Sequence, residues 1–385
     1  MRKYIFVFIL SLGFLCNLNS VHAADLVPEN RTTAKAEVLE VLTQERKNDP
    51  GTDTPTDYQT LKVKILDGDE KGAEVTVEND YLDLQKGDVF YLIHTVDKYN
   101  GIDVYSVSEP YRIPALYFFI GLFIICVILF GGKQGVRGII ALALSFFLIG
   151  YLLLPGILHG YSPVLVSIGV SSLIIILGSY ITHGFNRTTT SAVIGMIVTI
   201  TLTGILAYFS IKYARLSGFT TDESVYLSQN TRGQIDLAGL LLGGILIGLL
   251  GVLYDAAIGQ AIAVEELHEV GPHLPKSAIY KRAIRIGREH IGALVNTLAI
   301  AYVGASLPLL LLFYSFGTGD YTQTINKEIF STEIIRAIIG SIGLVLAVPI
   351  TTLVSTWMLV KEAPTKDAAL LALEEKAVEE KTHHH

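Results

Sequence analysis

The feature that most constrains this chain is an apolar segment that carries an acid, running from Leu237 to Val264. A helix rises ~1.5 Å per residue, so a helix of this length crosses the ~30 Å hydrocarbon core of a bilayer and places Asp255 at or near membrane depth. Ionisable groups in spanning helices usually face a bundle interior or a watery cavity. Asp255 therefore marks either a functional site inside a bundle or a carboxylate in the cytoplasmic headgroup zone.

Six further apolar runs of spanning length follow the first hundred residues. Charged residues make up 17% of the 385 residues, against about 25% in an ordinary soluble domain, which indicates a chain built for lipid. Together with the Asp255 segment, these runs predict an all-α polytopic membrane bundle of about seven transmembrane helices. The six runs lie at residues 113–131, 138–158, 163–182, 191–211, 291–313 and 334–359.

The first 23 residues have the pattern of a cleaved signal peptide. A positive start and an apolar stretch precede the small-residue cleavage pattern Val21-His22-Ala23. Lipoprotein processing at Cys16 and an uncleaved signal anchor are the alternatives. Once residues 1–23 are removed, Cys126 is the only cysteine in the sequence, so we expect neither an intrachain disulfide nor a cysteine metal site.

Residues 24–112 are typical of a small exported β domain. Five short runs alternate apolar and polar residues, and turn signals rich in Gly, Asn and Asp separate them. A compact β-barrel of the OB or SH3 kind is the expected architecture. The runs lie at residues 34–42, 58–66, 73–77, 88–96 and 103–107. The acidic turns of this domain do not match an EF-hand loop, so we expect neither a metal nor a cofactor there. The acidic residues in these turns are Asp67, Asp69, Glu70, Asp80, Asp83 and Asp88.

The distribution of basic residues predicts the orientation in the membrane. An exported domain ahead of seven spans, residues 113–360, puts the tail, residues 361–385, in the cytoplasm, and basic residues should then concentrate on the inner loops. We therefore expect a multipass protein of the bacterial plasma membrane. The predicted inner loops and tail hold Lys133, Arg137, Arg187, Lys276, Lys281, Arg282, Arg285, Arg288, Lys361, Lys366, Lys376 and Lys381. The predicted outer loops hold mainly Arg215, Arg232 and Lys327.

Small residues line the segment that carries Asp255. Gly251 and Gly259 lie one turn either side of Asp255, on the same face of a helix. Close helix packing is the default explanation for such glycines, and the face shared with Asp255 adds a functional one. The predicted packing glycines are Gly239, Gly243, Gly244, Gly248, Gly251 and Gly259.

The run at residues 291–313 carries polar groups at helical spacing. Asn296 and Ser306 fall on one stripe with Tyr302 beside it, and Gly304 and Pro308 can break the helix and free carbonyl groups. Broken helices beside an intramembrane acid recur in transporters. We expect Asp255 to be buried between its own span and this one, with these polar neighbours: Gln260, Asn296, Tyr302 and Ser306.

Four blocks of the apolar region occur in a recognisable order: HGFNRTTT at 183–190, GVLYDAAIGQAIAVEEL at 251–267, GREHIGALVNTLAIAYVGASLPLLLLF at 287–313 and GLVLAVPITT at 343–352. In these blocks the chain resembles the YibE/F-like family of bacterial multipass membrane proteins. The resemblance implies a multipass membrane protein and supplies no substrate. Where the family often has two adjacent acids, this chain has Tyr254-Asp255, so a mechanism that needs a carboxylate pair is in doubt. The matching motif positions are Asp255, Gln260, Glu266, Asn296, Tyr302, Gly304 and Ser306.

Three functional classes are weighed against these features. A secondary transporter or a pathway for an ion or small solute explains the acid, the polar stripe and the breakable helices together. A non-transporting envelope component, whose exported β domain binds a partner, explains the domain layout but gives Asp255 no role. An enzyme is not expected, because the sequence has no HExxH, no GxGD-type aspartate pair, no Ser-His arrangement and no nucleotide loop.

The expected partners follow from the same features. Membrane lipid is one, and a second membrane or envelope protein is another on the envelope reading. The net charge of −7 and the scattered basic residues exclude a nucleic-acid partner. The sequence leaves the oligomeric state open.

Overall fold

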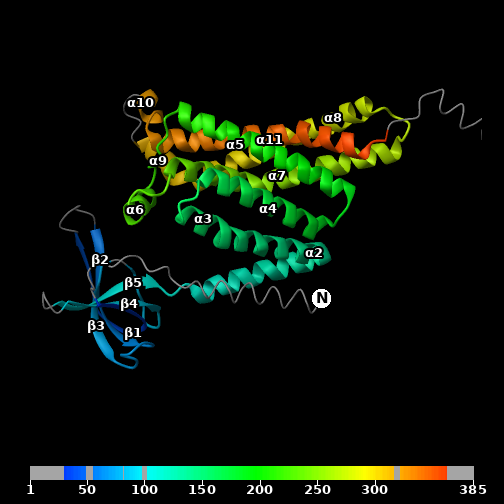
Figure 1. The fold of residues 1–385 in the computed structure, drawn as a ribbon. Helices are drawn as coiled ribbons and strands as arrows, with labels where there is room; N and C mark the ends of the chain where they lie inside the picture. Colours follow the sequence, from blue (N-terminus) through cyan, green and yellow to red (C-terminus); the bar gives the residue numbers. More distant parts are fainter. Residues whose placement is uncertain (1–29, 49–54, 81, 98–101, 316–320, 362–385) are drawn as a thin grey trace, which may run out of the picture. The chain divides into compact units, whose positions relative to one another are not determined.

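The computed structural model describes residues 30–48, 55–80, 82–97, 102–315 and 321–361. The chain divides into two compact units, one ending at Phe130 and the other continuing from Gly131. The first holds the five strands and the first half of helix α2, and the second holds the remaining helices (Figure 1). The predicted signal peptide and residues 362–385 of the predicted tail lie outside the described residues.

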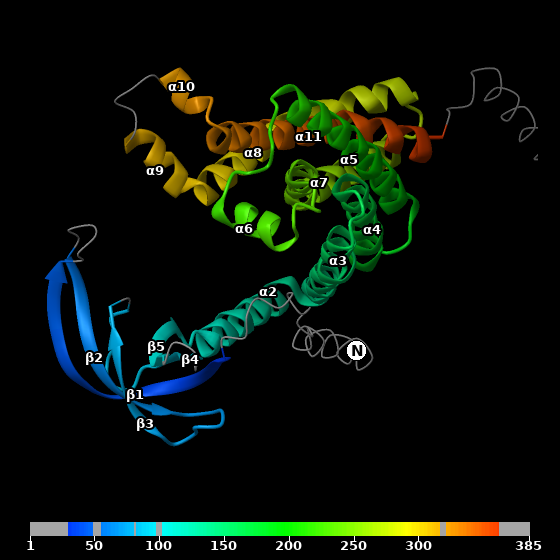
Figure 2. The same ribbon diagram turned by 60° about the vertical axis from the view of Figure 1, so that its left-hand side comes forward.

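One antiparallel sheet contains all five predicted strands, in the order β3-β2-β1-β4-β5. The strands are β1 (Asn30–Asn48), β2 (Pro55–Ile65), β3 (Glu74–Asn79), β4 (Val89–Asp97) and β5 (Ile102–Pro110). β1 is central because its 19 residues are long enough to pair with both β2 and β4. Register shifts near Val38 and Val41 accompany its curvature, which Figure 2 shows. The sheet is a half-barrel, whereas a compact barrel of the OB or SH3 kind was predicted.

The half-barrel has its own core. Alternation along β1 buries Ala36 and Val38, and alternation along β2 buries Leu61, Val63 and Ile65. These residues are at most 2% exposed, so the predicted two-residue period is confirmed as an inward apolar face. This unit therefore does not depend on the apolar helices for its core.

The helical region begins with a long broken helix. α2 (Ile113–Leu148) continues through a π-helical turn, η1 (Ile149–Leu153), into α3 (Leu154–Leu158). Gly132 inside α2 has φ 53° and ψ −134°, which is not helical. The later helices are α4 (Pro163–His183), α5 (Arg187–Tyr213), α6 (Asp222–Asn230), α7 (Leu237–Val270), α8 (Lys276–Ala305), α9 (Leu307–Ser315), α10 (Tyr321–Ile325) and α11 (Glu328–Leu359).

Among the described residues, five helices are long and apolar enough to cross a membrane, and the number becomes six if the bent pair α8 and α9 is one span. The five are Ile113–Leu158, Pro163–His183, Arg187–Tyr213, Leu237–Val270 and Glu328–Leu359. The predicted count of seven is not confirmed. It differs because the first two predicted spans form one run of 46 residues, with the non-helical Gly132 between them.

α5 and α11 pack antiparallel along a line of small residues, here called the seam. Its members are Ser191, Gly195, Thr199 and Thr203 on α5 with Gly343, Ala347, Thr351 and Ser355 on α11, all of them buried. The hydroxyl oxygens of Ser191 and Ser355 are 2.9 Å apart. A methyl group on Gly195 would lie 2.9 Å from Thr351 Cα, and one on Gly343 would lie 2.6 Å from Thr203 Oγ1. The two backbones approach closely because members recur every fourth residue on both helices.

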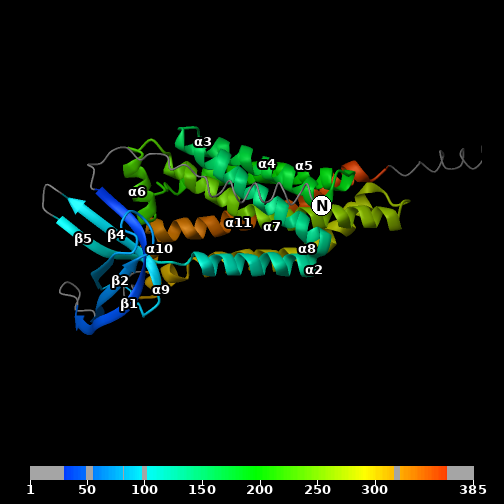
Figure 3. The ribbon, with the colours of Figure 1, turned by 90° about the horizontal axis from the view of Figure 1, so that it is seen from below.

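α7 is the central helix of this unit. It contacts α4, α5, α8 and α11, and Figures 2 and 3 show it among them. Its buried stripe includes Leu242, Ile245, Leu249 and Leu253, each at most 1% exposed. The turn between α4 and α5 explains the HGFN part of the first sequence block: Gly184 ends α4 at φ 80°, and Asn186 caps α5 by accepting from Thr189 N at 2.6 Å.

Candidate functional site

The glycines of α7 divide between two neighbours and an open face. A methyl group on Gly239 would lie 3.3 Å from Pro163 Cβ of α4, and one on Gly243 would lie 2.4 Å from Ser167 Oγ. Gly248 instead faces Tyr302 of α8. Gly244, Gly251 and Gly259 have nothing within 4 Å of a methyl position. The predicted packing role is thus seen for three of the six glycines.

Asp255 lies on that open face and is exposed. Two residues along a helix correspond to a rotation of about 200°, so Asp255 points away from the stripe that buries Leu253. The expectation that Asp255 is buried between α7 and α8 is wrong for this reason. The residue before it, Tyr254, makes the interhelical contacts: its hydroxyl bonds with Thr182 and lies 3.0 Å from His183 Nδ1.

Gln260 is buried, but its partner lies on α11. Thr352 donates its hydroxyl to Gln260 Oε1 at 2.8 Å. A methyl group on Gly287 of α8 would lie 2.8 Å from Gln260 Nε2, so the amide fits only because residue 287 is glycine. Gln260 therefore joins three helices, and the structure does not bring it against Asp255 as predicted.

The remaining predicted positions separate into two groups. Glu266, Asn296 and Gly304 are exposed on α7 and α8. Tyr302 and Ser306 are partly buried. Ser306 bonds to Glu333 of α11, and Tyr302 lies within electrostatic reach of Glu333 and Arg336, two residues that the sequence reasoning did not include.

These four residues, Tyr302, Ser306, Glu333 and Arg336, form what is here called the bend cluster. α8 and α9 meet at a bend of 68°, and Ser306 lies between them. Ser306 donates its hydroxyl to Glu333 Oε2 at 3.1 Å. Arg336 Nη1 lies 3.0 Å from Glu333 Oε1 and 3.4 Å from Glu333 Oε2. The broken helix thus places a hydroxyl against an ion pair of α11.

Two donors in the bend cluster have no hydrogen-bond partner within the described residues. They are the Tyr302 hydroxyl and Arg336 Nε, and both atoms are buried. The tip of the Tyr302 ring is held between α7 and α11, since a methyl group on Gly248 or Gly340 would lie 3.1 Å or 3.4 Å from its oxygen. Buried donors are usually paired, because an unmet one costs free energy.

Glu333 and Arg336 carry a signal that the sequence alone contains. Arg336 interrupts the apolar run at 334–359, and Glu333 precedes it by three residues, which is pairing distance on a helix. The prediction concentrated on the acid of α7 and passed over this pair. A charge of each sign at such spacing, at the start of an apolar run, indicates a paired polar site among the spans.

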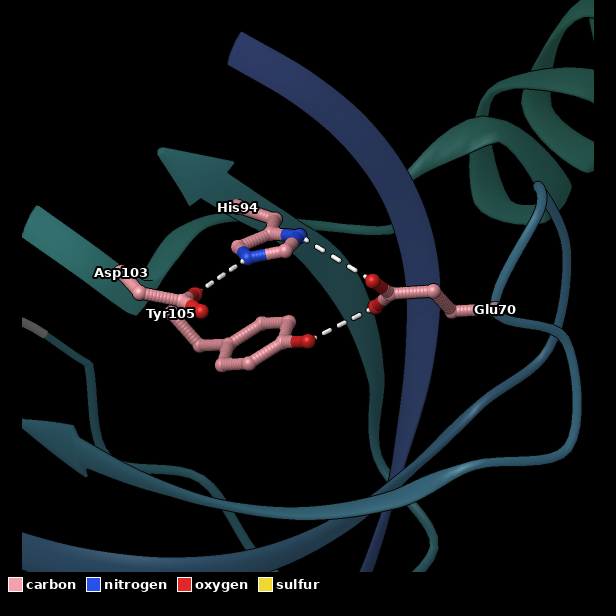
Figure 4. Close-up of polar contacts among 4 residues, drawn as sticks. All are labelled: Glu70, His94, Asp103 and Tyr105. Carbon is pink, nitrogen blue, oxygen red and sulfur yellow. Dashed lines mark hydrogen bonds and ion pairs between the residues drawn. The ribbon is translucent and has the colours of Figure 1, made fainter. Parts of the chain in front are cut away.

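A separate polar cluster lies in the half-barrel (Figure 4). Glu70, in the connection from β2 to β3, accepts from the Tyr105 hydroxyl at 2.8 Å and lies 3.3 Å from His94 Nδ1. His94 Nε2 is 2.7 Å from Asp103 Oδ1, and its ring stacks on Tyr105. Burial, followed by the bond to the Glu70 carboxylate, raises the pKa of Tyr105 to about 12. The described residues contain no group of three or more His, Cys, Asp or Glu side chains that could hold a metal ion.

A protein-family model described as YibE/F-like protein matches residues 119–361. The chain belongs to the YibE/F-like family. The match covers the apolar helices and includes the bend cluster, whereas the five strands of the half-barrel lie outside it. Neither a curated protein nor a solved structure matches this YibE/F-like chain. Family membership and the apolar helices together indicate a membrane protein.

Proposed function

We propose that this YibE/F-like protein provides a pathway across the membrane for a small polar solute or ion, with the bend cluster as its polar site. The observation that carries the proposal is the Glu333–Arg336 ion pair beside the break between α8 and α9. Charged groups among spanning helices are costly and usually line substrate or ion paths. Broken helices hold polar groups at such sites in known transporters.

The proposal includes seven crossings and a fixed orientation in the bacterial plasma membrane. The run Ile113–Leu158 would be ~69 Å long as one helix, about twice the hydrocarbon thickness, so the break at Gly132 supports two crossings. The bent pair α8 and α9 supplies the remaining span. Arg187 and Lys361 lie at the helix ends opposite to the contact between Ser217 and Glu328, which supports a cytoplasmic C-terminus and an extracytoplasmic half-barrel.

Transport by the purified chain in vesicles tests the proposal. Currents evoked by concentration jumps of potassium chloride, sodium acetate, sodium phosphate and sodium glutamate would be recorded from proteoliposomes. At least one solute should move, and Arg336→Gln should reduce that flux at least ten-fold. Glu223→Gln, which alters an exposed acid of α6 outside the bend cluster, should retain it. Folded wild-type protein that moves none of these solutes would argue against the pathway.

A non-transporting envelope component is the second candidate function. The observation in its favour is that Asp255, the acid first associated with transport, is exposed, while the half-barrel has a core of its own. On this reading a partner should crosslink to the half-barrel in intact membranes, and the crosslink should be lost when residues 24–112 are deleted. Absence of flux together with such a crosslink would favour the envelope function.

A further inference from the structure

The ligand chemistry of the bend cluster follows from which of its groups are already paired. Arg336 uses Nη1 on Glu333, while its Nε is buried without a partner in the described part of the chain. The Tyr302 hydroxyl also has no partner in the described part of the chain. It lies 3.4 Å from where a methyl group on Gly340 would be, and Gly340 is one turn beyond Arg336 on α11. Residues four apart on a helix share a face, so the two unmet donors lie on one side of α11.

A guanidinium and a hydroxyl donor on one face are suited to an oxyanion. Arg presents its N–H groups in a planar fork that matches the oxygens of a carboxylate or phosphate. The group that now occupies part of this fork is itself a carboxylate, that of Glu333. Ser306 donates to the same carboxylate at 3.1 Å, so Glu333 keeps a partner if it leaves the guanidinium.

Space at the cluster favours a small group. Tyr302 lies against Gly248 of α7 and Gly340 of α11, two positions that have no side chain beyond hydrogen. The Arg336 and Glu333 side chains are 30% and 24% exposed, so part of the ion pair is accessible, whereas the two unmet donor atoms are themselves buried. A ligand that is mostly one oxyanion group satisfies both conditions.

We propose that Arg336 and Tyr302 bind the oxyanion group of a small solute, and that Glu333 acts as an internal competitor that holds the guanidinium until the solute displaces it. The inference rests on the proposed pathway function and names the substrate class of that pathway. Binding exchanges one carboxylate at Arg336 for another anion, with Ser306 retaining Glu333. Release is the reverse exchange.

Ligand-dependent thermal unfolding of the purified full chain tests the inference without a transport assay. The probes are sodium acetate and sodium phosphate, compared with sodium chloride at equal ionic strength. A ligand that binds the folded state raises the unfolding temperature according to its affinity. Acetate or phosphate should raise it in the wild type, and Glu333→Gln should bind the same anion about ten-fold more tightly, because the competing charge is gone.

Variants of the other groups separate the proposal from a structural role of the ion pair. Arg336→Gln should abolish the response, and Tyr302→Phe should weaken it by removing one donor. Because Arg336→Gln leaves the charge of Glu333 without its counter-charge and can destabilise the fold, the double variant Glu333→Gln with Arg336→Gln serves as a folded, uncharged control that should not respond. An equal anion response in Glu333→Gln and in this double variant would overturn the proposal.

The remaining outcomes also decide the question. A response to added phosphatidylglycerol, with none to acetate or phosphate, would assign the guanidinium to a lipid headgroup and overturn the soluble ligand. Flux that is unchanged by these anions, in a protein that does transport, would reject the oxyanion and leave the pathway intact. The expected anion responses in a protein that moves nothing would support the binding site and reject the pathway.

Discussion

The two ends of α11 are both polar, yet they are packed in opposite ways. Toward its C-terminus, the seam sets glycines and hydroxyl side chains of α5 and α11 against one another without room for an added methyl group. Toward its N-terminus, the bend cluster holds a charged pair that is one quarter to one third exposed, with two donors unmet. Neutral hydroxyls can bond to their own helix and so allow close packing, whereas charges need partners and reach them where a helix is broken. We therefore assign structure to the seam and function to the bend cluster.

The largest expected effect comes from filling the seam. Gly195→Leu should leave little cooperatively folded protein, because even a methyl group would lie 2.9 Å from the Thr351 backbone. Overpacking costs about 1–3 kcal/mol, and more where backbone must move. Thermal unfolding in detergent measures the effect. The matched control is Gly251→Leu on the open face of α7, where nothing lies within 4 Å. Similar losses in both variants would mean that the seam is not specially close-packed.

A second substitution tests how closely the chain packs at the end of the helical region that contains Glu328, away from the bend between α8 and α9. Gly218 has φ 84°, and a methyl group there would lie 2.5 Å from the carbonyl of Leu237. Gly218→Ala should cost about 1–2 kcal/mol for the left-handed backbone and a similar amount for the clash. Gly233→Ala, with φ 70° and open space, isolates the backbone cost. If both variants unfold at the same temperature, the contact with α7 is not tight.

A smaller effect is expected at the bend itself. Ser306→Ala removes the hydroxyl that donates to Glu333, and a bond to a charged group contributes about 1.5–3 kcal/mol when buried, less here because the pair is partly exposed. We expect a loss of about 1 kcal/mol in the unfolding free energy. Ser315→Ala is the matched control, since the Ser315 hydroxyl donates to the Leu311 carbonyl of its own helix, α9. A Ser306 variant as stable as its control would show that the Ser306 hydroxyl does not stabilise the bend cluster.

The smallest effect extends the comparison to the polar cluster of the half-barrel. The pKa of Tyr105 is raised from 10.0 to about 12, so the folded half-barrel favours the protonated phenol. Its contribution to stability is complete below pH 10 and is lost as pH rises from 10 toward 12. The difference in unfolding temperature between the wild type and Tyr105→Phe should shrink over that interval. A difference that stays constant through the interval would show that burial and the Glu70 carboxylate do not raise the pKa of the phenol.

The sequence predicted where helices and strands occur better than it predicted which side of each helix is buried. All five strands follow from a two-residue alternation whose inward residues the structure buries, as at Val38 and Val63. Length and composition predict the apolar helices. They do not establish the count of seven spans, because the first two predicted spans are joined through Gly132 in a single run. In an apolar helix every face is apolar, so hydrophobic periodicity carries little information about rotation.

The candidate site illustrates the same limit. Tyr302 and Ser306 were predicted, and the structure brings them together with Glu333 and Arg336. Asp255 was predicted to be buried, yet it lies opposite the stripe of Leu253, because the glycines that suggested an interface on its face are those left open. The partner of Gln260 depends on the absence of a side chain at Gly287, a relation across helices that one sequence without its fold does not contain.

The seam also bears on how α5 and α11 can move. Its members recur every four residues on both helices, but in the present register Thr351 meets Gly195 and Thr203 meets Gly343. A slide of four residues, about 6 Å, would instead bring Thr199 against Thr351, two branched side chains. The seam therefore fixes the register of the two helices as well as their separation. A contact outside the repeat holds the same register: the Glu328 carboxylate accepts the backbone N–H groups of Ser217 and Gly218 at 2.6 Å and 2.8 Å. Glu328 thus sets the position of a helix whose next charged residues along the chain are Glu333 and Arg336.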